Sequence, residues 1–192
     1  MALSHLLTAR LNINPIIFIS GRHANPRSGL GRFVTDTYEP LHSLFMDDRF
    51  LKQPFPQQIS TTRELLLRTD QCKHDGIVIA HSYGAYLVLH SLIGEAVFAP
   101  KIILVSPILG YGSSNGFMMM AAGRKRLSNA ITENNFPMIN GVALVGEHDT
   151  QTSIETLRIL SNATGLRLDI ASDQTHQIEP SLIRNLLERE IA

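Results

Sequence analysis

The segment from 76 to 90, Gly-Ile-Val-Ile-Ala-His-Ser-Tyr-Gly-Ala-Tyr-Leu-Val-Leu-His, constrains the fold more than any other part of the chain. It opens with an apolar run at 77–80 that is too short for a helix and is typical of a strand buried on both faces. A helix-spaced apolar pattern follows with almost no loop between. Ser82 is therefore expected on a very tight turn, where crowding requires small residues two positions before and after it. Ala80 and Gly84 meet that requirement.

This pattern resembles the nucleophile elbow of the α/β-hydrolases, a small-x-Ser-x-Gly turn between a strand and a helix. His81 is the common second residue of that motif, and Ala80 stands where the first glycine is more usual. The resemblance implies that Ser82 is a nucleophile. Ser82 could instead serve only as the N-cap of the following helix, which is a frequent role of serine.

The remaining chain alternates strands and helices. Buried strands are expected at 16–19, 77–81, 101–106 and 142–146, a weak strand at 57–59, and a strand with one exposed face, at the sheet edge, at 166–170. Helices are expected at 32–45, interrupted near Pro40, then from 60, from the elbow to about 96, at 152–163 and at 181–189. The alternation predicts a three-layer α/β/α fold with an open, mainly parallel six-stranded sheet.

The resemblance adds an order to this sheet. It implies the spatial order 2-1-3-4-5-6, with the chain entering at the family's third strand and without the family's two leading antiparallel strands. In such a sheet, ligands bind at the carboxyl ends of the strands, at the point where the strand order reverses. That point lies between the first and third strands, where Gly21 and Arg22 would meet Ser82.

Composition limits the classes of protein that the chain can represent. A chain of 192 residues with 44% hydrophobic content can bury one core, so a single domain over 1–192 is expected. Its 17 basic residues equal its 17 acidic residues, which argues against nucleic acid and anionic membranes and favours a small or weakly charged ligand. No cofactor is expected, and the oligomeric state is left open.

The cysteine content and the N-terminal residues both favour a cytoplasmic protein. Cys72 is the only cysteine, which excludes an internal disulfide framework and a Cys-rich zinc site and fits a reducing cytoplasm. The first ten residues do not form a signal peptide, and no apolar run approaches the roughly 18 residues that a membrane span needs. We therefore expect a soluble cytoplasmic protein without membrane insertion.

The alternation of strand and helix patterns is interrupted between 110 and 135, where Gly110, Gly112 and Gly116 precede three consecutive methionines. Three adjacent side chains cannot all face one side of a helix. The segment is either a surface helix with a poor pattern or a small cap over an apolar pocket. On the second interpretation, Met118 and Met119 contact substrate. The basic cluster at 124–126 is interpreted as a solvated face.

Three candidate catalytic residues each follow a strand at its carboxyl end: Ser82, Asp149 and His176. Their chain order of serine, acid and histidine is that of the α/β-hydrolases. His176 would take the hydroxyl proton of Ser82 and return it to the leaving group, and Asp149 would hold the imidazole in its tautomer. Asp173 is an alternative acid. His148 and Asp149 could instead be metal ligands, but no third ligand has a matching spacing, and no metal is expected.

The resemblance also implies an oxyanion hole formed by the backbone amides of Tyr83 and Arg22, with Gly21 and His23 beside the substrate. The function expected from these residues is a serine hydrolase that cleaves a small ester or thioester through an acyl-serine intermediate. Two alternatives remain. One is a binding or regulatory protein that keeps the fold without turnover, and the other is an amidase or lyase that uses the same triad.

Overall fold

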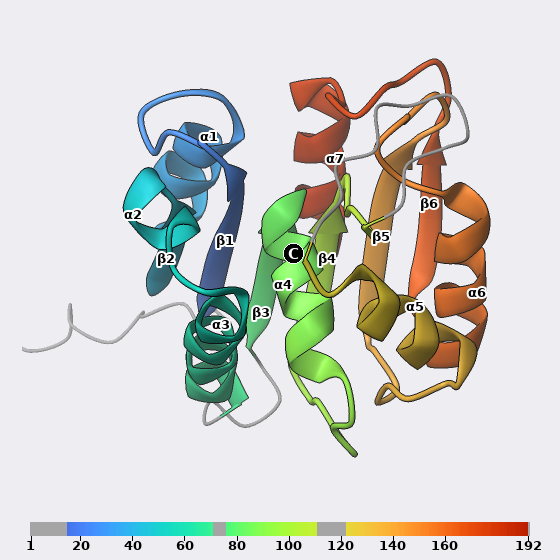
Figure 1. Cartoon of the computed structure of the whole chain (residues 1–192). Coiled ribbons are helices and arrows are strands. Elements are labelled where there is room, and N and C mark those ends of the chain that lie inside the picture. The colour runs from blue at the N-terminus through green and yellow to red at the C-terminus, as the bar shows by residue number, and fades with distance from the viewer. Residues whose placement is uncertain (1–14, 71–75, 111–121, 192) are drawn as a thin grey trace, which may run out of the picture.

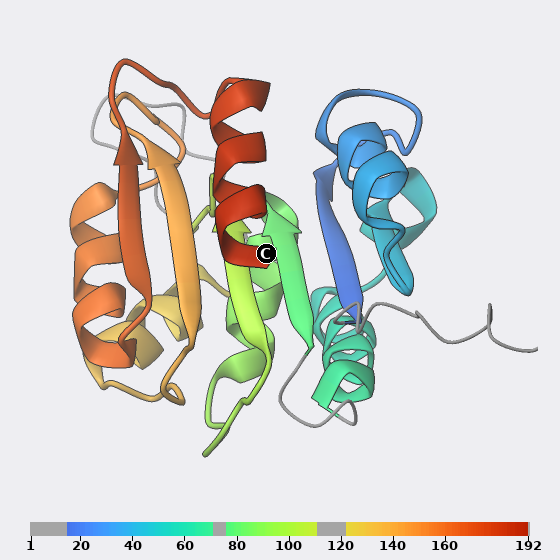
Figure 2. The same cartoon turned by 180° about the vertical axis from the view of Figure 1, so that it is seen from behind.

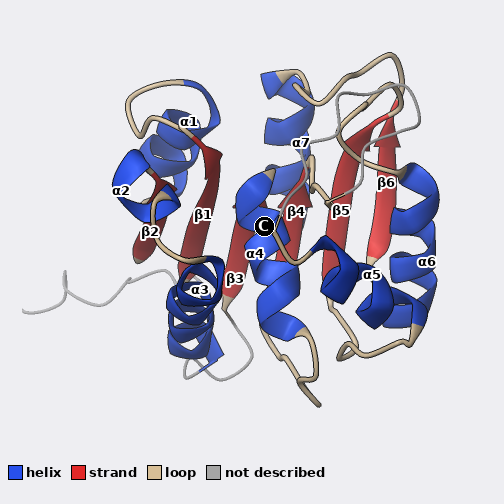
Figure 3. Ribbon diagram, viewed as in Figure 1, coloured by secondary structure: helices blue, strands red, loops and turns tan. Residues whose placement is uncertain are grey.

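Six parallel strands form the centre of the computed structural model, which describes residues 15–70, 76–110 and 122–191. Their order across the sheet is β2-β1-β3-β4-β5-β6 (Figure 3), as the resemblance implied. The strands are β1 (Ile16–Arg22), β2 (His42–Met46), β3 (Ile77–His81), β4 (Lys101–Val105), β5 (Gly141–Gly146) and β6 (Arg167–Ala171).

Helices cover both faces of this sheet, so the three-layer expectation is confirmed (Figure 1). α3 (Phe55–Asp70), α4 (Tyr83–Leu92), α5 (Arg124–Thr132) and α6 (Ile154–Thr164) lie on one face. α1 (Gly29–Tyr38) and α7 (Pro180–Ile191) lie on the other, as the reverse view shows (Figure 2). The short α2 (Asp48–Leu51) follows β2.

The strands pack into two cores because their side chains alternate between faces. Ile17, Val78 and Ile102 pack toward α3 to α6, whereas Phe18, Ile79 and Ile103 pack toward α1 and α7. These six side chains are at most 1% exposed. A strand buried on both faces has no polar positions, which explains the continuous apolar runs in the sequence.

The helix predicted at 32–45 is wrong in its second half. α1 ends at Tyr38, Glu39 adopts a left-handed conformation with a φ of 43°, and Pro40 follows. Proline has no amide to donate and its ring blocks a continuing helix. Residues 42–46 therefore leave the helix and form β2, which pairs in parallel with β1.

The strand predicted at 57–59 is also wrong, because these residues lie in α3. Pro54 and Pro56 precede them, and proline is well tolerated at the first turn of a helix. The Gln58 side chain donates to the carbonyls of Leu51 and Gln53 and fixes the start of the helix. The second strand of the sheet is therefore β2, and the predicted order holds with a different segment in that place.

The other expected elements form close to their predicted bounds. β6 is an edge strand as expected, and α4 ends at Leu92 rather than near 96. α5 lies within the segment expected to be irregular, while Met118 and Met119 lie outside the described residues. Among the described residues, no helix combines the length and apolar character needed to cross a membrane.

Candidate active site

Ser82 is the single residue between β3 and α4, with a φ of 50° and a ψ of −113°. An L residue rarely adopts this backbone conformation, so the turn is strained. The amide of Ser82 donates to the carbonyl of Val105 at 2.9 Å, which ties the turn to the end of β4. A Cβ at Gly84 would collide with the carbonyls of Ile19 and Ser20. The lack of a side chain at Gly84, two residues after Ser82, thus lets α4 pass close to β1.

Ser82, His176 and Asp149 meet at the carboxyl end of the sheet. Ser82 Oγ lies 2.9 Å from His176 Nε2, and His176 Nδ1 lies 2.9 Å from Asp149 Oδ2. The side chain of Asp149 is fully buried and that of His176 is 15% exposed. The second carboxylate oxygen of Asp149 accepts the amide of Gln151 at 2.7 Å. Burial and this added hydrogen bond hold the carboxylate toward the imidazole.

Backbone contacts fix the loop that carries His176. The amide of Glu147 donates to the Ala171 carbonyl at 2.9 Å, and that of His148 donates to the Gln174 carbonyl at 2.8 Å. A Cβ at Gly146 would collide with the backbone at 174–175. The end of β5 and the loop after β6 are therefore pressed together, which brings the acid and the histidine into contact.

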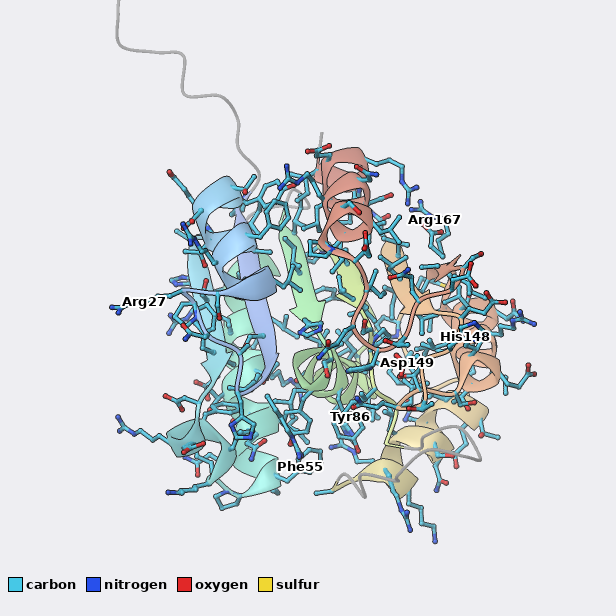
Figure 4. All side chains as sticks on the ribbon, turned by 90° about the horizontal axis from the view of Figure 1, so that it is seen from above. Arg27, Phe55, Tyr86, His148, Asp149 and Arg167 are labelled. Atoms are coloured by element: carbon cyan, nitrogen blue, oxygen red, sulfur yellow. The ribbon has the colours of Figure 1, made fainter. Side chains whose placement is uncertain are left out.

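The other acid and histidine of these loops turn away from the triad. The side chain of Asp173 is 94% exposed and lies near His148, with 3.9 Å between His148 Nε2 and Asp173 Oδ1. Figure 4 looks onto this end of the sheet, with Asp149 among the loops and His148 farther out. Ligand atoms of Glu147, His148 and Asp173 lie within 4.8 Å of one another, and all three residues are exposed. Asp149 is not part of this group.

His81 precedes the nucleophile and forms part of the wall of the site. Burial lowers the pKa of His81 to about 4, with a further contribution from the charge of His176. The two imidazole rings are tilted with 6.3 Å between their centroids. A Cβ at Gly21 would lie 2.9 Å from His81 Nδ1 and 3.1 Å from Ser82 Cβ. His81 is therefore neutral near pH 7, and only a glycine fits comfortably opposite it.

Arg22 and Tyr83, expected to supply backbone amides, also contact each other through their side chains. The Arg22 guanidinium lies over the Tyr83 ring, 4.1 Å from its centroid. The Tyr83 hydroxyl donates to Gln58 Oε1 at 2.8 Å, and burial raises the pKa of Tyr83. The sequence does not predict the position of Gln58, because no local pattern shows that a buried glutamine on α3 reaches the elbow.

A cavity of about 360 Å³ surrounds Ser82 and includes the predicted neighbours Gly21, Arg22 and His23. Ile108, Gln151 and Gln177 also line it. The imidazole of His23 is largely exposed and approaches Asp48, with 3.4 Å between His23 Nδ1 and Asp48 Oδ1. The site is thus a hollow of small-molecule size at the point where the strand order reverses.

Solved structures of esterases and related hydrolases resemble this chain along almost its whole length. Esterase PE8 aligns with a TM-score of 0.57 at 16% identity, covering 94% of this chain and 93% of its own. Thermogutta terrifontis esterase 2, phosphoramylated by tabun, aligns with a TM-score of 0.61 at 14% identity over 95% of this chain and 84% of its own. A protein of Xanthomonas campestris pv. campestris assigned to the α/β-hydrolase superfamily gives 0.59 at 14% identity, over 91% and 94%.

No protein-family model and no curated protein sequence matches the chain. The structural likeness and the strand order nevertheless agree, and the chain has the α/β-hydrolase fold. The expected resemblance to the α/β-hydrolases is thereby confirmed at the level of fold.

Proposed function

We propose that the protein is a serine hydrolase that cleaves a small ester or thioester, with Ser82 as nucleophile, His176 as general base and acid, and Asp149 as the residue that orients His176. The hydrogen-bonded chain from Ser82 Oγ through the imidazole to the buried carboxylate carries this proposal. The esterases among the structural neighbours, at 14% and 16% identity, support it.

The proposed reaction begins when the Ser82 oxygen attacks the substrate carbonyl and its proton moves to His176 Nε2. A serine hydroxyl is a weak nucleophile at neutral pH, so it needs a base within hydrogen-bond distance. Asp149 accepts the Nδ1 proton of His176 and stabilises the imidazolium that forms. The imidazolium then protonates the departing alcohol or thiol. In the second step His176 takes a proton from water as the water attacks the acyl-serine, and it returns that proton to the Ser82 oxygen as the acid product leaves.

The tetrahedral intermediate needs donors for its oxyanion. The amide of Tyr83 begins α4, directly after the nucleophile, and Arg22 ends β1 beside it. The amide of the next residue, His23, already donates to the Met46 carbonyl at 3.0 Å. We assign the oxyanion hole to the amides of Tyr83 and Arg22.

A fluorophosphonate probe tests the assignment of Ser82 as the nucleophile, because the probe reacts with an activated serine and leaves a stable adduct. The wild-type protein is expected to be labelled at Ser82, and Ser82→Ala, His176→Ala and Asp149→Asn to lose most of that labelling. Far-UV circular dichroism of each variant checks that the fold is kept. Lack of labelling in the wild type, or unchanged labelling in Ser82→Ala, would instead favour a binding protein without turnover.

A further inference from the structure

A second cavity, of about 560 Å³, is lined by residues of α1, of α7 and of the loop before α7. These two helices lie on the face of the sheet opposite α4 (Figure 2). Four apolar side chains make up much of the cavity's lining, and Glu179 is the one acidic residue among the described residues there. Leu30 and Phe33 contribute from α1, and Ile178 and Ile183 from α7 and the loop before it. We refer to these four residues as the α1/α7 pocket. A hollow of this size and character is suited to an aliphatic or aromatic group.

The α1/α7 pocket adjoins the cavity around Ser82, because His81 and Gln177 line both. His81 directly precedes Ser82, and Gln177 directly follows His176. A group attached to the carbonyl that Ser82 attacks would therefore lie next to the pocket.

His81 and Ser106, which also line the pocket, are both uncharged near pH 7. His81 is held neutral near pH 7 by burial, which lowers its pKa to about 4. Ser106, at the end of β4, also lines the pocket, and its buried hydroxyl has no hydrogen-bond partner within the described part of the chain. A neutral imidazole and one uncharged hydroxyl offer weak polar contacts without repelling an apolar ligand.

The opposite side of the Ser82 cavity is polar. There Arg22, His23 and Tyr83 are shared with a third cavity, of about 520 Å³, which Lys52 and Asp48 also line. The two sides of the nucleophile thus differ in chemistry. An unsymmetrical substrate would bind in one orientation, with its apolar part away from these charges.

We propose that the α1/α7 pocket binds the apolar arm of an ester or thioester substrate, while the polar arm of the same substrate lies beside Arg22 and Lys52. This inference rests on the proposed function and specifies its substrate class. Phe33 lines the pocket, and its ring is held by contacts with neighbouring side chains. The Tyr38 ring lies edge-on to it with 5.9 Å between centroids, and the Arg184 guanidinium lies 5.1 Å from its centroid.

The test compares two series of esters. In one, p-nitrophenyl esters carry acetyl, butyryl, hexanoyl or octanoyl groups, and in the other the same chain lengths are placed on the alcohol of acetate esters. In the series that carries its chain on the pocket side, kcat/KM is expected to rise about fourfold for each added methylene until the pocket is full. The series that responds identifies whether the apolar arm is the acyl or the alcohol group.

Variants of the pocket give the decisive comparison. Leu30→Trp should fill the pocket and lower the ratio of long-chain to acetyl turnover at least tenfold, and Phe33→Ala should shift the preference to longer chains. Leu41→Trp is the matched control, since Leu41 is 60% exposed and does not line the pocket. It should leave the chain-length profile of the wild type unchanged.

A small fluorophosphonate separates the possible failures. If it labels Ser82 in the wild type and in Leu30→Trp, but neither series depends on chain length, the α1/α7 pocket is not a substrate site and the proposed hydrolase stands. The same conclusion follows if Leu30→Trp lowers turnover equally at every chain length. If the wild type is neither labelled nor active, the proposed function fails, and the inference about the pocket fails with it.

Discussion

At the residue scale, Ser82 combines a half-buried hydroxyl at the active-site cavity with a strained backbone. Its φ of 50° and ψ of −113° suit glycine, whereas an L residue there costs about 1 to 3 kcal/mol. The strain is tolerated because the ends of β1 and β4 hold both sides of the turn. Stability is therefore given up at this position to keep the hydroxyl above the sheet.

This strain predicts a difference between two inactive variants. Ser82→Gly relieves the strained backbone, whereas Ser82→Ala keeps a Cβ and the strain with it. We expect the glycine variant to be more stable by about 1 kcal/mol, even though glycine gains more freedom in the unfolded chain. Urea unfolding of both variants measures this difference. A glycine variant less stable than the alanine variant would show that the turn is not strained in solution.

His90 is a second residue with an unfavourable environment. It is 1% exposed, and neither of its ring nitrogens has a hydrogen-bond partner within the described residues. The ring packs edge-on against Tyr86 and Phe55, with centroids 4.5 and 5.0 Å away. Burial lowers the pKa of His90 to about 4, and the charge of Arg126 adds to this effect.

His90 should therefore make the protein sensitive to acid. The unfolded chain binds a proton at this residue near pH 6.5 and the folded protein only near pH 4, so stability is full above pH 6.5 and falls between these values. The shift is worth about 3 kcal/mol at most, and His90→Phe should remove most of that loss. Unfolding free energies at pH 7 and pH 4.5 test this. His148→Gln, a change at a side chain that is 61% exposed, is the control and should leave the pH dependence as it is.

The residues of the candidate site differ in how well the sequence predicts them. Ser82 lies in a local pattern with a geometric cause, and Asp149 and His176 follow from strand ends and chain order. Gln58 has no such signal, because its hydrogen bond with Tyr83 joins residues that are distant in sequence. The sequence also gives no signal for the stacking of the Arg22 side chain on Tyr83. It does predict that Arg22 lies at the end of the first strand.

At the element scale, α7 is attached to the sheet by charged side chains as well as by its apolar face. Glu190 is buried and contacts Arg167 of β6 and Arg189 of α7, and its carboxylate lies 3.6 Å from Lys101 of β4. Burial by itself would raise the pKa of Glu190, but the hydrogen bonds from Arg167 and Arg189 outweigh it, and the pKa is lowered. The network therefore favours the ionised carboxylate.

Glu190→Gln should loosen α7. The substitution removes the negative charge that pairs with three cations and replaces one acceptor oxygen with an NH2 donor, and we expect the free energy of unfolding at pH 7 to fall by about 1 to 3 kcal/mol. Because the folded pKa of Glu190 lies below its ordinary value, its contribution is present above that value and is lost as the pH falls through the folded pKa. The difference between variant and wild type should shrink in acid. Glu188→Gln, on the exposed side of the same helix, should have little effect at either pH.

Strands that are buried on both faces are predicted well, because they appear in the sequence as continuous apolar runs. β1, β3, β4 and β5 are apolar on both faces and form within a few residues of the expected bounds. β2 was missed because the pattern of its five residues, which include His42 and Ser43, is weak, and its pairing with β1 decides its conformation. The start of α3 was missed because two prolines suit the start of a strand as well as the first turn of a helix.

At the scale of the whole molecule, the two helical layers share one sheet. The α1/α7 layer packs on Phe18, Ile79 and Ile103, and the other layer packs on the reverse side of the same strands. Removal of either layer would expose a fully apolar sheet face to water. Neither layer is therefore expected to unfold alone, in agreement with the single domain expected from the chain's length.

This coupling gives a prediction that depends on where the tyrosines lie. The chain has no tryptophan, and Tyr83 and Tyr86 pack in the layer opposite α7. In a protein that carries Tyr38→Phe and Tyr111→Phe, tyrosine fluorescence reports the α4 layer alone. Urea midpoints from this fluorescence and from far-UV circular dichroism should coincide.

Adding Glu190→Gln, on the α7 face, should lower both midpoints by the same amount, because weakening one helical layer destabilises a sheet that both layers need. Two separate midpoints, or a fluorescence midpoint unmoved by Glu190→Gln, would show that the layers unfold independently and that the single-domain prediction is wrong.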